Sequence, residues 1–361
     1  MKKLVVLDHL KKLADSARNY VDSSVLKVTN STLQSLTALQ NKLVPSGGLP
    51  GQVLIKKSKT DHDVEWTGYI VNDDLLDNSY FVGGGSHKGG GQFPINQRGQ
   101  TEWTSSGYTI DRWYLIKDGN GTVKLTSDGI EIIRTSGTYF DFRQRMQSID
   151  ESSQYTFSIL TSEGLYSGTS SKDSPSILTV PISSIGHLYF IKESGTWQVL
   201  IRSIRNDAPI LVKAAKLERG DRQTLAHQDA DGNWVLNKIP DFATELAKCQ
   251  RYQIQLRPES YNNYICLPCQ HALKETEMQI FIPTPVTLRT LPTISYTGKF
   301  ILVNYENGSS DPGIEVTDIK CKYYTTNGIY LTISTAGNLR RSVVYSFAGF
   351  PEANLLIDSN L

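Results

Sequence analysis

The chain has 361 residues, 20% of them charged, and a formal net charge of +1 at pH 7. This length exceeds one ordinary domain and predicts two or three globular units joined by connectors. The balanced charge argues against nucleic acid as a partner, because it provides no long-range field for a polyanion. The sequence has no apolar run of roughly 18 residues, so we expect no membrane insertion.

The first predicted element is a helix within residues 1–45. Residues 4–43 contain neither proline nor glycine. Apolar residues recur there at alternating spacings of three and four: Leu7, Leu10, Ala14, Ala17 and Val21, then, after a break near Thr29 to Thr32, Leu36, Leu39 and Leu43. A helix with so narrow a stripe is marginal in water by itself. The pattern therefore predicts a coiled coil between copies of the chain.

Residues 46–81 predict a small β knob or collar. A Pro- and Gly-rich stretch ends the helix, and two short strand patterns, 51–58 and 61–66, flank a polar turn. Residues 82–92 are rich in glycine, which is typical of a linker. A phosphate-binding loop would need a preceding buried strand, a following helix and a lysine at a fixed offset, and the sequence indicates none of these.

Residues 93–220 predict a two-sheet β sandwich. Val123 and Leu125 alternate with polar residues, Asp128 and Gly129 favour a turn, and Ile130 resumes the alternation, which is typical of a hairpin. The period of two continues through several short segments separated by Ser, Gly, Asp and Pro clusters.

Residues 221–240 predict a polar connector. Asp229, Asp231 and Asn233 have the spacing that begins a calcium loop, but the closing glutamate is missing. The same residue types favour turns, so we interpret this stretch as a turn.

Residues 241–361 predict a helix followed by a C-terminal β domain. Asp241 can cap a helix whose Phe242, Leu246 and Cys249 fall on one face. Several strand patterns follow, and Thr326-Asn327-Gly328 favours a tight hairpin turn between two of them.

The four cysteines lie in the last third of the chain. Cys266 and Cys269 have metal-knuckle spacing, and Cys249 and Cys321 could complete a zinc site. There is no second close pair, and Cys249 falls in the predicted helix. We therefore expect ordinary thiols, no metal and no cofactor.

Three motifs occur in a fixed order. Asn96-Gln97-Arg98-Gly99 leads to Tyr108-Thr109-Ile110-Asp111-Arg112-Trp113, then come Ala215–Gly220 and Glu245–Tyr252. Together they resemble receptor-binding tail fibres and baseplate-tip proteins of bacteriophages, prophages and phage-like bacteriocins, over about Gly47 to Leu361.

This resemblance implies a mainly β homotrimeric fibre with a coiled-coil helix, a small knob and a jelly roll at 93–220 similar to carbohydrate-binding modules. It implies that the C-terminal β domain at 241–361 serves receptor binding and trimerisation. It also implies that residues 1–45 attach to other tail or baseplate proteins. The first residues lack a secretory cleavage pattern. We accordingly expect synthesis in the host cytoplasm and assembly into a virion tail.

Catalytic signatures are missing from the sequence, so we expect no enzyme. The six histidines are scattered and no Gly-x-Ser-x-Gly elbow is present. The carboxylates are dispersed among predicted turns and strands, without the fixed pair that glycoside cleavage needs. In the resembling family, depolymerases mostly use repetitive parallel β-helices, and this chain shows no such repeat.

Candidate ligand-binding residues are aromatic and hydrogen-bonding side chains in two places. The first set is Trp103, Tyr108 and Arg112, and the second is the polar loop Tyr261, Asn262, Asn263 and Tyr264. A purely structural interpretation competes for the first set, with 108–113 as a core strand in which Asp111 and Arg112 pair. We expect Trp103 to be exposed.

The resemblance therefore implies non-catalytic, multivalent attachment to a bacterial cell-surface polysaccharide. Two alternatives stay open: a structural collar protein that binds other virion proteins, and a polysaccharide depolymerase.

Overall fold

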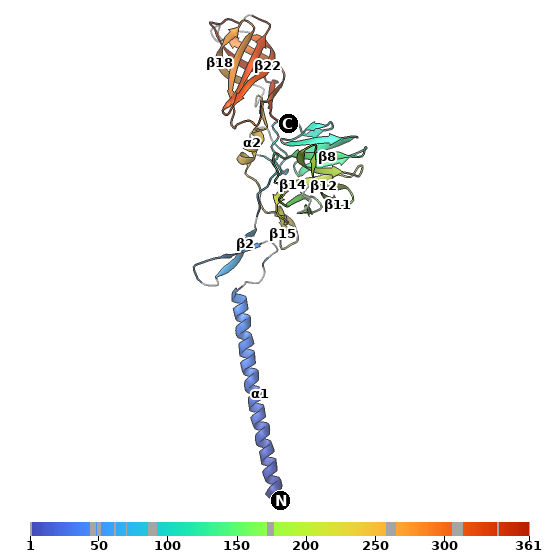
Figure 1. Cartoon of the computed structure of the whole chain (residues 1–361), viewed down its shortest axis with the longest axis vertical. Helices are drawn as coiled ribbons and strands as arrows, with labels where there is room; N and C mark the ends of the chain where they lie inside the picture. The colour runs from blue at the N-terminus through green and yellow to red at the C-terminus, as the bar shows by residue number, and fades with distance from the viewer. Residues whose placement is uncertain are drawn as a thin grey trace. The chain divides into compact units, whose positions relative to one another are not determined.

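The computed structural model describes residues 2–43, 48, 52–60, 63–69, 71–85, 92–171, 177–257, 265–304, 313–337 and 339–360. The protein is mainly β, with 47% of residues in strands and 13% in helices. It divides into two compact units, Met1–Ile70 and Val71–Leu361. Figure 1 shows the ribbon of both units, which are described separately below.

The first unit begins with α1 (Lys2–Leu43), a single helix of 42 residues (Figure 1). The threonines near the break in the apolar stripe stay helical, because the hydroxyls of Thr29 and Thr32 donate to the carbonyls of Val25 and Val28, each at 2.8 Å. The large apolar side chains of α1 are exposed, Leu10 by 61% for example. Within the described residues, neither helix is long and apolar enough to cross a membrane.

The first unit also contains the two strands predicted for the knob. They are β1 (Gln52–Lys56) and β2 (Val64–Tyr69), an antiparallel pair in which Leu54 lies opposite Trp66.

The second unit opens with a sandwich of two antiparallel six-stranded sheets. The first sheet has the order β10 (Leu165–Thr169), β9 (Tyr155–Thr161), β14 (Ile210–Arg219), β7 (Gly129–Arg134), β6 (Gly121–Thr126), β3 (Glu102–Trp103). The second has the order β11 (Ile177–Ile182), β12 (Gly186–Glu193), β13 (Thr196–Ser203), β8 (Phe140–Arg145), β5 (Trp113–Lys117), β4 (Gly107–Tyr108). The predicted hairpin is confirmed, since Thr126 pairs with Gly129.

Aromatic side chains fill the core between the sheets. The rings of Trp113 and Phe142 stack with centroids 4.7 Å apart, and Phe81 meets Trp113 edge-on at 5.3 Å. Phe81 and Leu76 are fully buried in this core. Residues 71–81, which the sequence grouped with the knob, therefore pack with the sandwich.

The expected core strand at 108–113 is wrong. β4 ends at Tyr108, and the N–H of Thr109 donates to the carbonyl of Trp113 at 2.9 Å, so the segment is a hairpin loop. Arg112 has a positive φ of 72° in this loop. Its guanidinium pairs with Asp77 at 3.0 Å and not with Asp111 as expected.

The connector forms a small hairpin of β15 (Ala226–Gln228) and β16 (Trp234–Leu236). Between them, the Asp229 carboxylate accepts the backbone N–H groups of Asp231 at 3.0 Å and Asn233 at 2.8 Å, which confirms the turn. Helix α2 (Phe242–Gln250) follows, and the Asp241 carboxylate caps it by accepting the Thr244 N–H at 2.9 Å.

The rest of the chain forms a small sheet and a closed barrel, whose strands β18 and β22 are labelled in Figure 1. The sheet has the order β17 (Gln253–Leu256), β25 (Asn354–Asp358), β20 (Thr293–Thr297). The barrel has the order β18 (Ile265–Lys274), β19 (Glu277–Pro283), β23 (Gly328–Thr335), β22 (Ile314–Thr325), β21 (Phe300–Asn304), β24 (Val344–Gly349). Thr325 pairs with Gly328, so the predicted tight hairpin is confirmed.

The first of the three motifs lies where the sandwich meets the C-terminal sheet. The fully buried Asp111 accepts from the backbone and side-chain N–H groups of Gln97, at 3.0 and 2.5 Å. The same Gln97 amide donates to the carbonyl of Gln253 at 2.8 Å, and Arg98 pairs with Asp358 at 3.2 Å. The first motif thus joins the sandwich to the C-terminal sheet.

Candidate functional site

The second sheet carries a row of polar and aromatic side chains on the face away from the core. Tyr108 lies opposite Tyr114, which lies opposite Arg143, then come Leu200 and Tyr189 on the next two strands. Directly opposed residues of antiparallel strands share one face of a sheet. The alternate positions of these strands, such as Trp113 and Phe142, fill the core.

A cleft of about 540 Å³ includes Tyr114 and Arg143 of this row, and we name it the sheet cleft. The turn between β12 and β13 forms one wall. Its lining residues are Tyr114, Ile116, Tyr139, Arg143, Arg145, Glu193, Ser194, Thr196, Gln198 and Arg202.

The carboxylate of Asp141 positions two cationic side chains of the sheet cleft, Arg143 and Arg202. Its fully buried carboxylate accepts from Arg202 at 2.6 and 2.8 Å and from Arg143 at 3.2 and 2.5 Å. Arg143 also pairs with Glu193 at 2.8 Å. The hydrogen bond to Asp141 raises the pKa of Arg202 above its ordinary value, so this guanidinium stays charged and fixed in direction.

Tyrosine side chains contact two further groups of the sheet cleft, the Arg202 guanidinium and the Gln198 amide. The Arg202 guanidinium lies 5.0 Å from the ring centre of Tyr189 and 5.7 Å from that of Tyr139. The Tyr114 hydroxyl donates to the Gln198 side-chain oxygen at 2.6 Å, and the Gln198 amide donates to Glu193. The cleft therefore offers positioned donors, acceptors and ring faces, the groups with which a polyhydroxylated ligand is bound.

A second cleft, of about 280 Å³, lies where the sandwich meets the C-terminal module, and we name it the junction cleft. Tyr108, Arg112, Tyr252 and Arg289 line it. Arg145 and Thr196 line both clefts, so the two are contiguous.

The structure separates the candidate residues of the sequence into three groups. Tyr108 and Arg112 both line the junction cleft. Tyr108 is half-buried, and burial raises the pKa of its hydroxyl. Arg112 is 6% exposed, and its guanidinium donates to the Arg145 carbonyl at 3.0 Å and lies 3.4 Å from the ring centre of Tyr252.

The expected exposure of Trp103 is wrong. It is only 4% exposed, because β3 pairs with β6 and sets Trp103 opposite the buried Val123. Trp103 belongs to the sandwich core and lines neither cleft. Tyr261, Asn262, Asn263 and Tyr264 lie outside the described residues.

Sequence reasoning missed most of the sheet cleft. In Asp141-Phe142-Arg143-Gln144-Arg145, charged residues alternate with others, so all three charges belong to one face. That alternation was available as a signal. The partners from β5 and β13 depend on strand order, which the sequence did not indicate.

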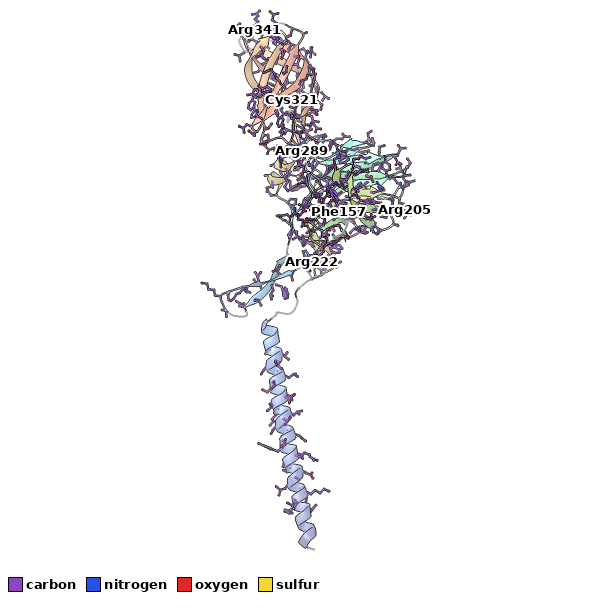
Figure 2. The ribbon with its side chains drawn as sticks, in the orientation of Figure 1. Phe157, Arg205, Arg222, Arg289, Cys321 and Arg341 are labelled. Carbon is purple, nitrogen blue, oxygen red and sulfur yellow. The ribbon has the colours of Figure 1, made fainter. Side chains whose placement is uncertain are left out.

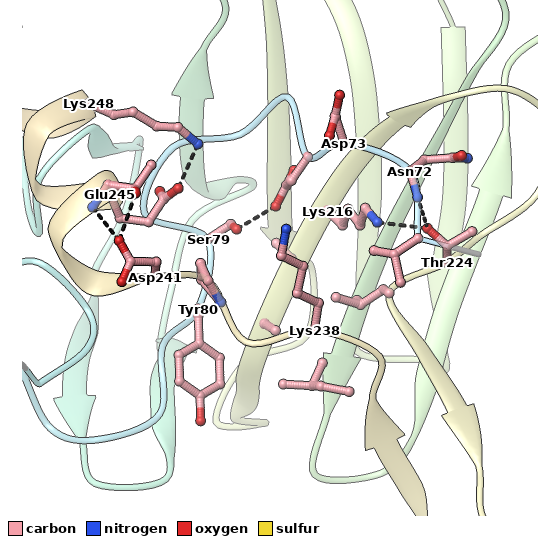
Figure 3. Close-up of a pocket in the computed structure, with 18 residues that line it drawn as sticks. Asn72, Asp73, Ser79, Tyr80, Lys216, Thr224, Lys238, Asp241, Glu245 and Lys248 are labelled. Carbon is pink, nitrogen blue, oxygen red and sulfur yellow. Dashed lines mark hydrogen bonds and ion pairs between the residues drawn. The ribbon is translucent and has the colours of Figure 1, made fainter. Parts of the chain in front are cut away.

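A third cavity, of about 330 Å³, lies between the sandwich, the connector and α2 (Figure 3). In it the Lys216 ammonium donates to the Thr224 hydroxyl at 2.7 Å, and Lys248 pairs with Glu245 at 2.6 Å. Nearby, the Asp74 carboxyl accepts from the Ser79 hydroxyl at 2.6 Å and from the Leu76 and Leu217 N–H groups. Desolvation outweighs these bonds and raises the pKa of Asp74 from 3.8 to about 7.

The thiols that the structure describes are those of Cys249 and Cys321. Burial raises the pKa of both thiols, and Cys249 is fully buried against Phe93 and Ile95. The side chains of Cys266 and Cys269 lie outside the described part. Among the described residues, no group of three or more His, Cys, Asp or Glu side chains could hold a metal ion.

A comparison of the chain with protein-family models gave no match, and no curated protein was significantly similar to it.

Proposed function

We propose that this chain is a receptor-binding protein of a bacteriophage-type tail, which attaches the particle to a bacterial surface glycan without cleaving it. The sheet cleft carries this proposal, because it combines a sandwich fold with aromatic rings and fixed hydrogen-bonding groups on an open sheet face. We also propose that the sandwich is a jelly roll similar to carbohydrate-binding modules. The three ordered motifs, through the family that they resemble, support this part of the proposal.

The side chains of the sheet cleft suit a sugar. The ring face of Tyr139, which lines the cleft, can stack on the apolar side of a pyranose. The guanidinium of Arg202 and the amide of Gln198 can bond its hydroxyls. Asp141 and Tyr114 already hold these groups in place, so little conformational entropy is lost on binding.

The exposed apolar side chains of α1 support a homotrimer. Leu10, Leu13, Val21, Val25, Leu33 and Leu36 are each more than half exposed. Copies of the same helix would cover them in a coiled coil, and residues 1–45 would attach the trimer to other tail or baseplate proteins. Three weak sites acting together would then give firm attachment through effective concentration.

The binding test compares the wild type with Tyr139→Ala on isolated bacterial cell walls and glycan arrays. We expect the variant to lose about fivefold in affinity, because one stacking ring contributes on the order of 1 kcal/mol. Tyr166→Ala is the matched control, since Tyr166 is also a half-buried tyrosine but lies on the other sheet. Equal binding by wild type and Tyr139→Ala would remove the sheet cleft from the proposal.

The two rival functions give different results in the same preparation. A collar protein would leave cell walls unbound at every concentration, and a depolymerase would release reducing ends from the polymer. A monomeric full-length chain in light scattering at micromolar concentration would contradict the trimer.

A further inference from the structure

The junction cleft and the hollow next to it hold more cations than carboxylates. The hollow has a volume of about 290 Å³ and shares Arg112, Arg145 and Tyr252 with the junction cleft. The cations that line the two are Arg112, Arg145, Lys192, Lys248, Arg251 and Arg289, whereas the carboxylates are Asp77 and Glu151. The chain as a whole carries a net charge of only +1, so this excess is local.

Two of these cations share one aromatic ring. The guanidinium of Arg112 lies 3.4 Å from the ring centre of Tyr252, and that of Arg289 lies 5.8 Å from it. Asp77 neutralises Arg112 at 3.0 Å. Arg289 makes no ion pair with a carboxylate in the part of the chain that the structure describes.

Backbone contacts hold Arg289 at this position. Its N–H donates to the carbonyl of Arg251 at 2.9 Å, and its neighbour Leu288 is buried in the barrel core. The main chain therefore holds the Cα of Arg289 beside the cleft, and its guanidinium lies against the ring of Tyr252. A bound anion would offset the excess of positive charge around this ring.

We propose that the junction cleft binds an oxyanion, phosphate or carboxylate, on the same surface polymer whose sugar lies in the sheet cleft. This inference rests on the proposed function and adds the ligand class. The shared lining residues Arg145 and Thr196 make one continuous path for a chain with alternating sugar and charge. Guanidinium groups suit this role, because their forked donors match phosphate and carboxylate oxygens.

The first test uses soluble probes that do not depend on cell walls. Calorimetry with the full-length protein compares glucose 1-phosphate, glucuronate and uncharged glucose at millimolar concentration. We expect at least one charged probe to bind more tightly than glucose and Arg289→Ala to reduce that affinity about tenfold. Arg289→Lys keeps the positive charge and should retain part of the affinity for the charged probe.

Arg205→Ala is the matched control, because it also removes one arginine charge but lies in an exposed loop of the sandwich; Figure 2 labels both residues. It should bind the charged probes as the wild type does. Equal loss in both variants, or no preference for either charged probe over glucose, would overturn the anion site.

The second test distinguishes the two sources of the anion. Cell walls are stripped of phosphodiesters with hydrofluoric acid, or their carboxylates are amidated. Loss of binding after the first treatment assigns phosphate, and loss after the second assigns carboxylate. If binding survives both treatments and Tyr139→Ala still weakens it, the anion site is wrong and glycan binding stands. If the wild type binds no wall at all, glycan attachment is wrong and the soluble probes decide the anion site.

Discussion

At the scale of single residues, buried carboxylates organise the second unit. Asp141 positions two arginines under the sheet cleft, and Asp111 joins the sandwich to the C-terminal sheet through Gln97. Both carboxylates are fully buried. Such groups are costly to desolvate, and they remain charged only where donors surround them.

Asp141→Ala should lower the free energy of unfolding by about 3 kcal/mol, because it leaves the buried Arg143 and its neighbour Arg202 without their shared carboxylate. Urea unfolding followed by circular dichroism measures this change. Asp221→Ala removes an exposed carboxylate and should change stability by less than about 0.5 kcal/mol. Similar values for the two variants would contradict the role of Asp141.

Asp74→Asn should flatten the pH dependence of stability. Burial raises the pKa of Asp74 to about 7 from 3.8, so between these pH values the folded protein holds a proton that the unfolded chain has released. The free energy of unfolding therefore falls as pH rises through this window, by up to about 1.4 kcal/mol per pH unit. Thermal unfolding from pH 4 to 8 measures the slope, and Asp73→Asn, at the exposed neighbouring residue, should leave it unchanged.

At the scale of elements, sequence patterns within a few residues predicted most of the helices, turns and hairpins. The helices, the knob strands and the hairpins at Gly129 and Gly328 follow from spacing, capping and turn residues within a few positions. The loop at 109–112 was missed because Tyr108, Thr109, Ile110 and Trp113 are residue types that favour strands. Two interactions favour the loop conformation. The Thr109 N–H donates a hydrogen bond to the Trp113 carbonyl, and Arg112 forms an ion pair with Asp77, which is distant in sequence.

Gly129→Ala should destabilise the first sheet by at least about 2 kcal/mol. Gly129 has a φ of 145°, and a Cβ there would lie 2.3 Å from the carbonyl oxygen of Val212 on β14. Gly232→Ala provides the comparison, since Gly232 has a φ of 83° but open space around it. It should cost about 1 kcal/mol in chemical unfolding, and an equal cost for the two would show that the contact with Val212 has no effect.

At the scale of the whole molecule, the sandwich and the C-terminal module belong to one compact unit. The predicted division into 93–220, 221–240 and 241–361 treats them as separate. Glu245 on α2 accepts a hydrogen bond from the N–H of Asn78, and the Gln97 amide donates to the carbonyl of Gln253. Hydrogen bonds therefore connect the two parts of this unit.

A fragment comprising residues 71–361 should therefore fold without residues 1–70. We expect one cooperative thermal transition within about 2 °C of the corresponding transition in the full-length chain. Differential scanning calorimetry measures it. Two separate transitions in the fragment would instead show that the sandwich and the barrel unfold independently, against the packing at the junction.

The sequence by itself determined the mainly β class, the N-terminal helix, the turns and the α2 cap, because these depend on residues within a few positions of one another. Only the tertiary structure decided that Trp103 is buried, that Arg112 pairs with Asp77, and that Tyr114, Arg143 and Arg202 share one cleft. Strand order brings those residues together from distant parts of the chain, and no local pattern encodes it. The same holds for Arg289, which main-chain contacts bring to Tyr252 and the junction cleft.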